Sequence, residues 1–246
     1  MRSQNRLPAL LIFLYVITLF SACSADDPSP ELNTAIVPTK HEGRAFERFN
    51  TINRRISNLQ GDLGILLVGD SITERWETTG SEVWNQYFEQ LNTLNIGISG
   101  DRTQHVLWRL KNGNIDSISP KITVLLIGTN NITSERNSAQ ETLAGINKVV
   151  EQLLDGLPGT TLILYGIFPR GTEFNEMRGE ITQINQALKN WEQHDRVGFI
   201  DIGHLFLDND GNIPNEIMPD ALHLSKQGYK IWAESMAPII NEILDN

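Results

Sequence analysis

Short apolar runs alternate with amphipathic stretches along most of the chain, and this alternation is the feature that most limits its fold. Five runs have the length and composition of buried strands: residues 64–69, 93–98, 122–127, 161–168 and 197–202. Helical spacing of apolar residues appears around them, at 41–59, 81–91, 103–110, 139–154, 180–191 and 226–244. Strands that alternate with helices pair in parallel and carry helices on both faces. We therefore expect a single α/β domain.

Polar or glycine residues follow three of these expected strands directly. Gly69-Asp70-Ser71 comes after the first run, Asn95 to Gly100 closes the second, and Gly128 to Asn131 follows the third. Ligands of parallel α/β sheets bind outside the carboxyl ends of the strands. The sequence therefore predicts that Ser71, Gly100 and Asn130 meet at one edge of the sheet.

Ser71 has the position of a nucleophile, at the turn from a strand into a helix. A serine at this place also suits the N-cap of a helix, and that interpretation stays open. Thr73 stands where a Gly-x-Ser-x-Gly elbow has its second glycine, which argues against the usual α/β-hydrolase pattern.

Asp220 and His223 form the expected acid and base of the site. At this spacing one turn of backbone can bring a carboxylate to an imidazole, where it fixes the tautomer and stabilises the imidazolium. An N-capping aspartate beside a surface histidine is the alternative. The other four histidines (His41, His105, His194 and His204) lack such a close partner in a loop, and His105 falls in a helical stretch. With no His-x-x-x-His pattern, we expect neither a catalytic metal nor a cofactor.

Backbone and amide donors for an oxyanion are also present. The N–H groups of Ser71 and Gly100 and the side-chain amide of Asn130 can hold a developing negative charge. Turn glycines that end a strand, and an Asx-turn at Asn130 and Asn131, are the alternatives for these blocks.

The first 40 residues read as an export signal and a tether. Arg2 and Arg6 precede an apolar stretch, and small residues lead to Cys23, the only cysteine among the 246 residues. We expect a signal peptide over 1–22, a tether over 23–40 and the α/β domain over 41–246. This junction resembles that of bacterial lipoproteins, which implies lipidation of Cys23 and attachment to a membrane. Ordinary cleavage near Ala25 is the alternative.

Two further features bear on location and partners. Ser24 follows the cysteine in place of the aspartate that favours inner-membrane retention, which points to the outer membrane and thus to the periplasm or cell surface. The formal charge of −10 argues against nucleic acid as a partner.

The four blocks together resemble the SGNH (GDSL-type) hydrolase superfamily, whose Ser, Gly, Asn and His are found here as Ser71, Gly100, Asn130 and His223. The resemblance is closest to the platelet-activating-factor acetylhydrolase-like subgroup and spans about residues 46–240. It is carried by the segments 97–110, 127–131, 166–171 and 222–225. Asn131 departs from the Asp that is commoner in the superfamily, but the subgroup shares it.

The resemblance implies a three-layer α/β/α fold with a five-stranded parallel sheet of flavodoxin-like type. It also implies an acyl pocket at Ile72, Thr129 and Leu222, whose bulk leaves room for a short acyl group. A relative in the subgroup forms dimers, so a homodimer is one expectation.

From these residues we expect a serine esterase that removes short acyl groups, acetyl foremost, from a carbohydrate or a lipid. A lysophospholipase or thioesterase for longer chains is the second interpretation. A glycan-binding protein without catalysis on the same fold is the third, and the intact set of catalytic residues argues against it. The alcohol half of the ester is left open, since nothing in the sequence selects sugar over lipid.

Overall fold

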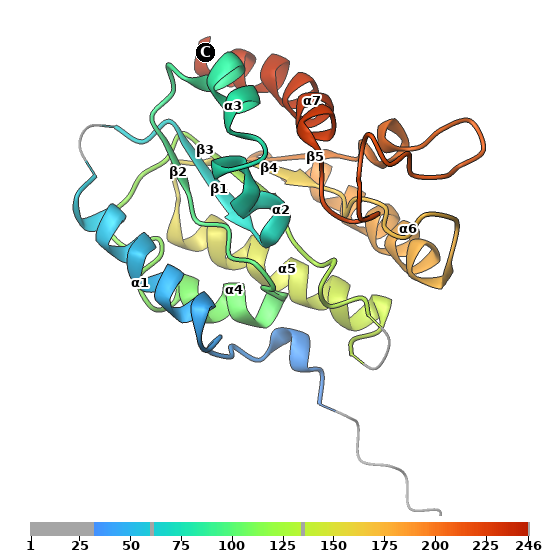
Figure 1. Cartoon of the computed structure of the whole chain (residues 1–246). Helices are drawn as coiled ribbons and strands as arrows, with labels where there is room; N and C mark the ends of the chain where they lie inside the picture. The colour runs from blue at the N-terminus through green and yellow to red at the C-terminus, as the bar shows by residue number, and fades with distance from the viewer. Residues whose placement is uncertain (1–31, 60–61, 134–135, 246) are drawn as a thin grey trace, which may run out of the picture. The chain divides into compact units, whose positions relative to one another are not determined.

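The computed structural model describes residues 32–59, 62–133 and 136–245. Its compact unit begins at Asn33 and contains the whole sheet (Figure 1). The expected signal peptide and Cys23 lie outside the described residues. No helix in the described part of the chain has the length and apolarity needed to cross a membrane.

The described residues form five strands and seven α-helices. The strands are β1 (Ile65–Gly69), β2 (Thr93–Asn95), β3 (Ile122–Leu126), β4 (Thr161–Tyr165) and β5 (Val197–Ile200). The helices are α1 (Arg44–Ser57), α2 (Ser71–Glu74), α3 (Ser81–Phe88), α4 (Thr103–Leu110), α5 (Ala139–Gly156), α6 (Glu176–Leu188) and α7 (Lys226–Asp245). Short 3-10 helices cover Thr34–Ile36 (η1), Arg75–Glu77 (η2), Lys189–Gln193 (η3) and Gly203–Phe206 (η4).

The sheet is parallel throughout, in the order β2-β1-β3-β4-β5. The chain first builds outward from β1 to β2 and then crosses back to β3. The strand order therefore reverses between β1 and β3, and in sheets of this kind ligands bind beyond the carboxyl ends of the strands at such a point. This is the flavodoxin-like, three-layer arrangement expected from the sequence.

Apolar side chains cover both faces of the sheet, because successive residues of a strand point to opposite sides. In β1, Leu66 and Val68 pack with α1, α4, α5 and α6, while Ile65 and Leu67 pack with α2, α3 and α7. Figure 1 shows these two helical layers on opposite sides of the strands. Each fully buried Leu, Ile or Val of this kind contributes roughly 1.5–3 kcal/mol.

β2 and β4 end three residues earlier than the sequence suggested, and β5 ends two residues earlier. β2 ends at Asn95, although Ile96 and Ile98 still donate backbone hydrogen bonds to Leu67 O (2.9 Å) and Gly69 O (3.2 Å) of β1. β4 ends at Tyr165 because the backbone of Ile167 is bonded by the Asn185 side chain and no longer by a neighbouring strand. Side-chain hydrogen bonds have replaced the sheet ladder at the end of β4, whereas backbone bonds to β1 continue past the end of β2.

The folded unit also starts earlier than the expected boundary at residue 41. Ala35 is fully buried, and its carbonyl accepts a hydrogen bond from Thr103 Oγ1 of α4 (2.8 Å). Thr39 N donates to Gln104 O (3.0 Å). The sequence predicted a tether over 23–40, but residues 33–40 are held against α4 by these contacts. The polar, proline-punctuated composition of residues 24–40 as a whole gave no sign of that packing.

Candidate active site

Ser71 is the first residue of α2, and Asp70 alone separates it from the carboxyl end of β1 at Gly69. The Asp70 side chain caps this helix by accepting a hydrogen bond from Ile72 N (3.0 Å). The N-cap interpretation of Ser71 is therefore wrong, because Asp70 has that position. Ser71 is 8% exposed, and its Oγ lies 2.9 Å from Nε2 of His223.

His223 lies in the loop before α7, where Asp220 contacts it twice. Asp220 Oδ2 lies 2.7 Å from His223 Nδ1, and Oδ1 accepts the His223 backbone N–H at 2.7 Å. The carboxylate thus orients both the ring and the backbone of the same residue. The structure joins Ser71, His223 and Asp220 in one hydrogen-bonded chain, as the sequence predicted.

The Asp220 carboxylate is favoured in its charged form. Partial burial by itself would raise the pKa of Asp220, but the hydrogen bonds from the backbone and ring of His223 outweigh it and lower that pKa. The loop takes an unusual backbone conformation at Ala221, whose φ is 53°. Two hydrogen bonds hold this residue: Ala221 N donates to Met218 O (2.9 Å) and Gly171 N donates to Ala221 O (2.8 Å).

The two expected oxyanion donors outside Ser71 lie beside one another. Gly100 is exposed and has φ 83°, a conformation that favours glycine. Asn130 follows β3, and its Nδ2 donates to the carbonyl of Asp101, the residue after Gly100 (3.0 Å). This bond uses one amide hydrogen of Asn130 and leaves the other free for an oxyanion. Asn131 plays a different part: it is fully buried, and its side chain bonds to Thr103, Gln104 and Asn137.

The three residues of the expected acyl pocket adjoin these groups in the chain. Ile72 directly follows Ser71, Thr129 directly precedes Asn130, and Leu222 directly precedes His223. Ile72 and Thr129 are buried, whereas Leu222 is half-buried. Arg170 reaches this place from the loop after β4 and donates to Thr129 O (2.7 Å).

His41 has a partner that the sequence did not reveal. Its Nδ1 lies 3.0 Å from Oδ1 of Asp101, and its ring stacks on His105 with centroids 4.2 Å apart and an interplanar angle of 18°. His41 and Asp101 are 60 positions apart in the sequence, so no local spacing could have signalled their contact. His105, which the sequence placed in a helical stretch, is buried in α4 and accepts a hydrogen bond from Arg102 N (3.1 Å).

This cluster of His41, Asp101 and His105 is the one group in the described part of the chain with the side chains and distances of a metal site. Its geometry fits hydrogen bonding better. A metal ion lies near the plane of each imidazole that binds it, and two nearly parallel, stacked rings do not share such a point. Arg109 also contacts the Asp101 carboxylate at 2.8 Å, which supplies its counter-charge.

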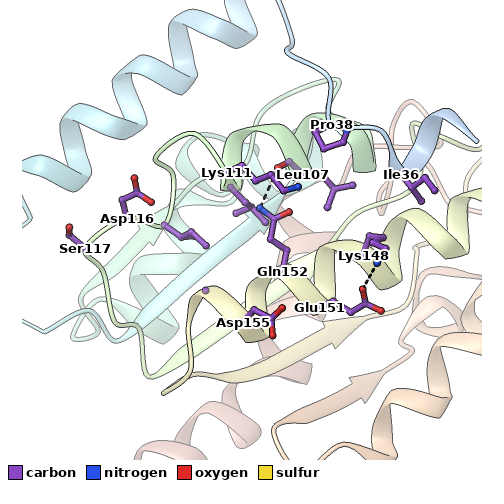
Figure 2. A pocket seen from close by; sticks show the side chains of 13 residues that line it. Ile36, Pro38, Leu107, Lys111, Asp116, Ser117, Lys148, Glu151, Gln152 and Asp155 are labelled. Atoms are coloured by element: carbon purple, nitrogen blue, oxygen red, sulfur yellow. Dashed lines mark hydrogen bonds and ion pairs between the residues drawn. The ribbon is translucent and has the colours of Figure 1, made fainter.

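The hollow of about 870 Å³ shown in Figure 2 lies elsewhere, between α4, α5 and the N-terminal segment. Charged side chains of both signs surround it, among them Lys111, Lys148 and Glu151, and an ion pair joins the last two. Neither Ser71 nor His223 lines it. The candidate catalytic residues therefore lie at the carboxyl edge of the sheet and do not line this hollow.

Comparison with known proteins agrees with this arrangement. Residues 67–231 match the model of the GDSL-like Lipase/Acylhydrolase family. The chain belongs to this family. The matched segment begins within β1 and ends within α7, so it contains every residue of the site described above except His41.

Curated relatives of this GDSL-type hydrolase include the platelet-activating factor acetylhydrolase IB subunit alpha2 of Rattus norvegicus. It is 37% identical over 182 residues, which cover 74% of this chain and 77% of the relative. The subunit beta homolog of Drosophila melanogaster is 34% identical over 218 residues, covering 87% and 95%. The resemblance to the platelet-activating-factor acetylhydrolase-like subgroup is thereby confirmed.

Solved structures share the fold of this hydrolase. A GDSL-like lipase from Bacteroides thetaiotaomicron superposes with a TM-score of 0.66 at 20% identity, over 80% of this chain and 97% of that one. An acetylxylan esterase from Geobacillus stearothermophilus gives 0.58 at 19% identity, over 73% and 95%. The family and its curated relatives make this protein a carboxylic ester hydrolase.

Proposed function

We propose that this protein is a serine esterase that removes short acyl groups, acetyl foremost, through an acyl-enzyme. The observation that carries the proposal is the chain of hydrogen bonds from Ser71 Oγ to His223 Nε2 (2.9 Å) and from His223 Nδ1 to Asp220 Oδ2 (2.7 Å). A nucleophile bonded to a base that a third group orients is the arrangement required for nucleophilic catalysis.

The mechanism follows from these contacts. His223 takes the proton of Ser71 Oγ as the oxygen attacks the ester carbonyl, and Asp220 stabilises the imidazolium that forms. The N–H groups of Ser71 and Gly100 and the amide of Asn130 bind the oxyanion. His223 then protonates the leaving alcohol, and a water molecule repeats the sequence to release the acid.

The preference for short acyl groups rests on the residues around Ser71. Ile72, Thr129 and Leu222 flank the nucleophile, the oxyanion amide and the base in the chain, and the first two are buried. The names of two relatives, an acetylhydrolase subunit and an acetylxylan esterase, point to acetyl esters. Since one name refers to a lipid and the other to a sugar, both alcohol classes remain within the proposal.

The test is hydrolysis of p-nitrophenyl acetate, butyrate, octanoate and palmitate by residues 24–246, beside Ser71→Ala. We expect activity that falls steeply beyond acetate and is lost in Ser71→Ala. Full activity in Ser71→Ala would contradict the serine mechanism. A preference for octanoate would overturn the short pocket and favour a lysophospholipase or thioesterase. Binding of glycans without turnover of any ester would favour a non-catalytic protein.

Asp220→Asn tests the orienting carboxylate separately. An asparagine still accepts the backbone N–H groups but no longer stabilises the imidazolium, so we expect kcat to fall roughly 100- to 10,000-fold. Asp208→Asn is the matched control, because Asp208 Oδ1 also accepts two backbone N–H groups, from Asp210 and Asn212, in an exposed loop. Equal kcat values in the two variants would remove Asp220 from the mechanism.

We also propose that the mature protein is a lipoprotein of the bacterial outer membrane, anchored through Cys23. Support comes from the sequence of residues 2–24 alone. Export to the periplasm or cell surface would give the enzyme access to acetylated glycans and lipids. A homodimer, expected from the subgroup, is tested by sedimentation of residues 24–246.

A further inference from the structure

Arg109 is buried although it carries a charge, and it contacts residues next to the candidate active site. It lies on α4, is 2% exposed, and uses all three nitrogens of its guanidinium. Nε donates to Asp101 Oδ2 (2.8 Å), Nη1 to Asn114 Oδ1 (3.1 Å) and Nη2 to Gly69 O (3.1 Å). Gly69 precedes the Asp70-Ser71 turn, so one side chain links the nucleophile's strand to the loop that follows β2.

Asp101 is the partner of this arginine and has no exposed surface. Its Oδ1 faces His41 Nδ1 (3.0 Å), while its carbonyl accepts Nδ2 of Asn130 (3.0 Å). Its backbone N–H donates to Ile98 O (3.1 Å), and Ile98 N in turn donates to Gly69 O (3.2 Å). Both oxyanion donors outside Ser71 are therefore attached to this residue: Gly100 precedes it in the chain and Asn130 bonds to its carbonyl.

A buried ion pair is a weak source of stability, because removing two charges from water costs about as much as their attraction returns. A well-packed apolar pair would serve the fold as well. The charged pair instead fixes the relative positions of the groups it contacts, because the planar guanidinium holds several acceptors at once. Here those acceptors are Gly69 and Asp101, which carry the nucleophile and the oxyanion donors.

We propose that the Arg109–Asp101 ion pair positions the oxyanion hole against Ser71, with His41 as the outer hydrogen-bond partner of Asp101. Arg109 and Asp101 are positioning residues: they act through Gly69, Gly100 and Asn130 and do not touch the substrate. Oxyanion donors contribute to catalysis only when they are fixed before the charge develops. The pair therefore lowers the energy of the transition state more than that of the bound ester. This inference rests on the proposed serine mechanism.

The test is the neutral double variant Asp101→Asn/Arg109→Gln, which keeps hydrogen-bonding groups and approximate volume but removes both charges. With p-nitrophenyl acetate we expect kcat to fall about 10- to 100-fold while KM stays within about threefold. A trifluoromethyl ketone forms a tetrahedral anion on the serine and probes the oxyanion hole directly. Its inhibition constant should rise by the factor by which kcat/KM falls.

Thr123→Val is the matched control for loss of a buried polar contact. Thr123 Oγ1 bonds to Thr160 Oγ1 (2.9 Å) in the amino-terminal half of β3, away from the carboxyl edge of the sheet. It should lower stability yet leave kcat and ketone inhibition within about twofold. If the double variant does not fold, Arg109→Lys takes its place, because an ammonium keeps the charge but cannot span the three acceptors.

A folded double variant, or a folded Arg109→Lys, with kcat within twofold of the wild type would overturn the proposal. So would a loss of kcat with unchanged ketone inhibition, or an equal loss in Thr123→Val. Ser71→Ala is assayed beside them: retained activity there would signal failure of the serine mechanism, whereas failure of the ion-pair proposal appears as full activity in the charge variants.

Discussion

At the scale of single residues, Asp70 is the buried acid whose environment is most unfavourable to charge. It is fully buried; Oδ1 accepts the Ile72 N–H, and Oδ2 has no hydrogen-bond partner in the described structure. Burial is the main cause that raises the pKa of Asp70 to about 7, and the nearby Asp101 carboxylate adds to it. The residue before Ser71 therefore changes its charge near neutral pH.

Asp70 should make the protein less stable as pH rises from about 4 to about 7. In this range the folded state binds more protons at Asp70 than the unfolded state, whose carboxyl has a pKa near 3.8. The free energy of unfolding therefore falls with pH, by at most roughly 4 kcal/mol in total, and levels off above pH 7. Urea unfolding of the wild type and Asp70→Asn at pH 4, 5.5, 7 and 8.5 measures it.

The readout is how the difference in free energy of unfolding between Asp70→Asn and the wild type changes with pH. Asparagine keeps an acceptor for Ile72 N but does not titrate, so the variant gains on the wild type as pH rises. Its absolute stability is also shifted by the amide placed at the unpartnered Oδ2, which does not vary with pH. A difference that stays constant from pH 4 to 8.5 would show that Asp70 titrates as it does in the unfolded chain.

Other residues show why the site could be predicted only in part. Ser71 and His223 are 152 positions apart, yet each carries a local sign: a serine after a strand, and a histidine with an aspartate three positions before it. His41 has no such sign, because its partner Asp101 comes from a different part of the chain. A residue can be predicted when its neighbours in the sequence signal its role. A pair such as His41 and Asp101, which has no such signal, becomes visible only in the folded structure.

At the scale of secondary structure, Gly69 lets the end of β1 approach the first turn of α2. A Cβ at Gly69 would lie 2.1 Å from Thr73 Oγ1 and 2.4 Å from the carbonyl of Leu126 on the adjacent strand β3. Contacts this short require the backbone to move. The glycine that ends the strand is therefore a packing requirement of the turn that presents Ser71.

Gly69→Ala should lower the free energy of unfolding by about 2–3 kcal/mol and reduce kcat, since it displaces the turn before Ser71. Gly198→Ala is its control: Gly198 also lies in a strand, β5, but a Cβ there would meet nothing within 4 Å. Urea unfolding and p-nitrophenyl acetate assays on both variants measure the difference. Equal stability of the two variants would mean that the crowding at Gly69 is relieved without cost.

Element boundaries followed the sequence where a local signal existed. α5 begins at Ala139, as its apolar spacing predicted, and Ser138 with Glu141 forms a capping box at its start. α6 begins at Glu176, four residues before the expected 180, because Asn175 caps it by accepting the Arg178 N–H. Apolar periodicity shows where a helix is buried, whereas its start is set by the cap.

At the scale of the whole molecule, we expect the proposed lipid anchor at Cys23 to be independent of folding and catalysis. Cys23 precedes the compact unit that begins at Asn33. Cys23→Ser should therefore move the protein from the membrane fraction to the soluble fraction of cells, with kcat unchanged. Immunoblots of the two fractions, beside esterase assays, measure this. An unchanged distribution would contradict lipid anchoring and favour ordinary cleavage near Ala25.

The sequence by itself predicted the fold class and the candidate catalytic residues, which the structure brings together. Alternation of apolar runs with helical stretches specifies a parallel α/β sheet, and parallel strands bring Ser71, Gly100 and Asn130 to one edge. Only the tertiary structure decided how those residues are supported. The contact of Arg109 with Gly69, the stacking of His41 on His105 and the packing of residues 33–40 against α4 all join segments distant in sequence. Such contacts depend on the three-dimensional path of the chain, which no local pattern of residues encodes.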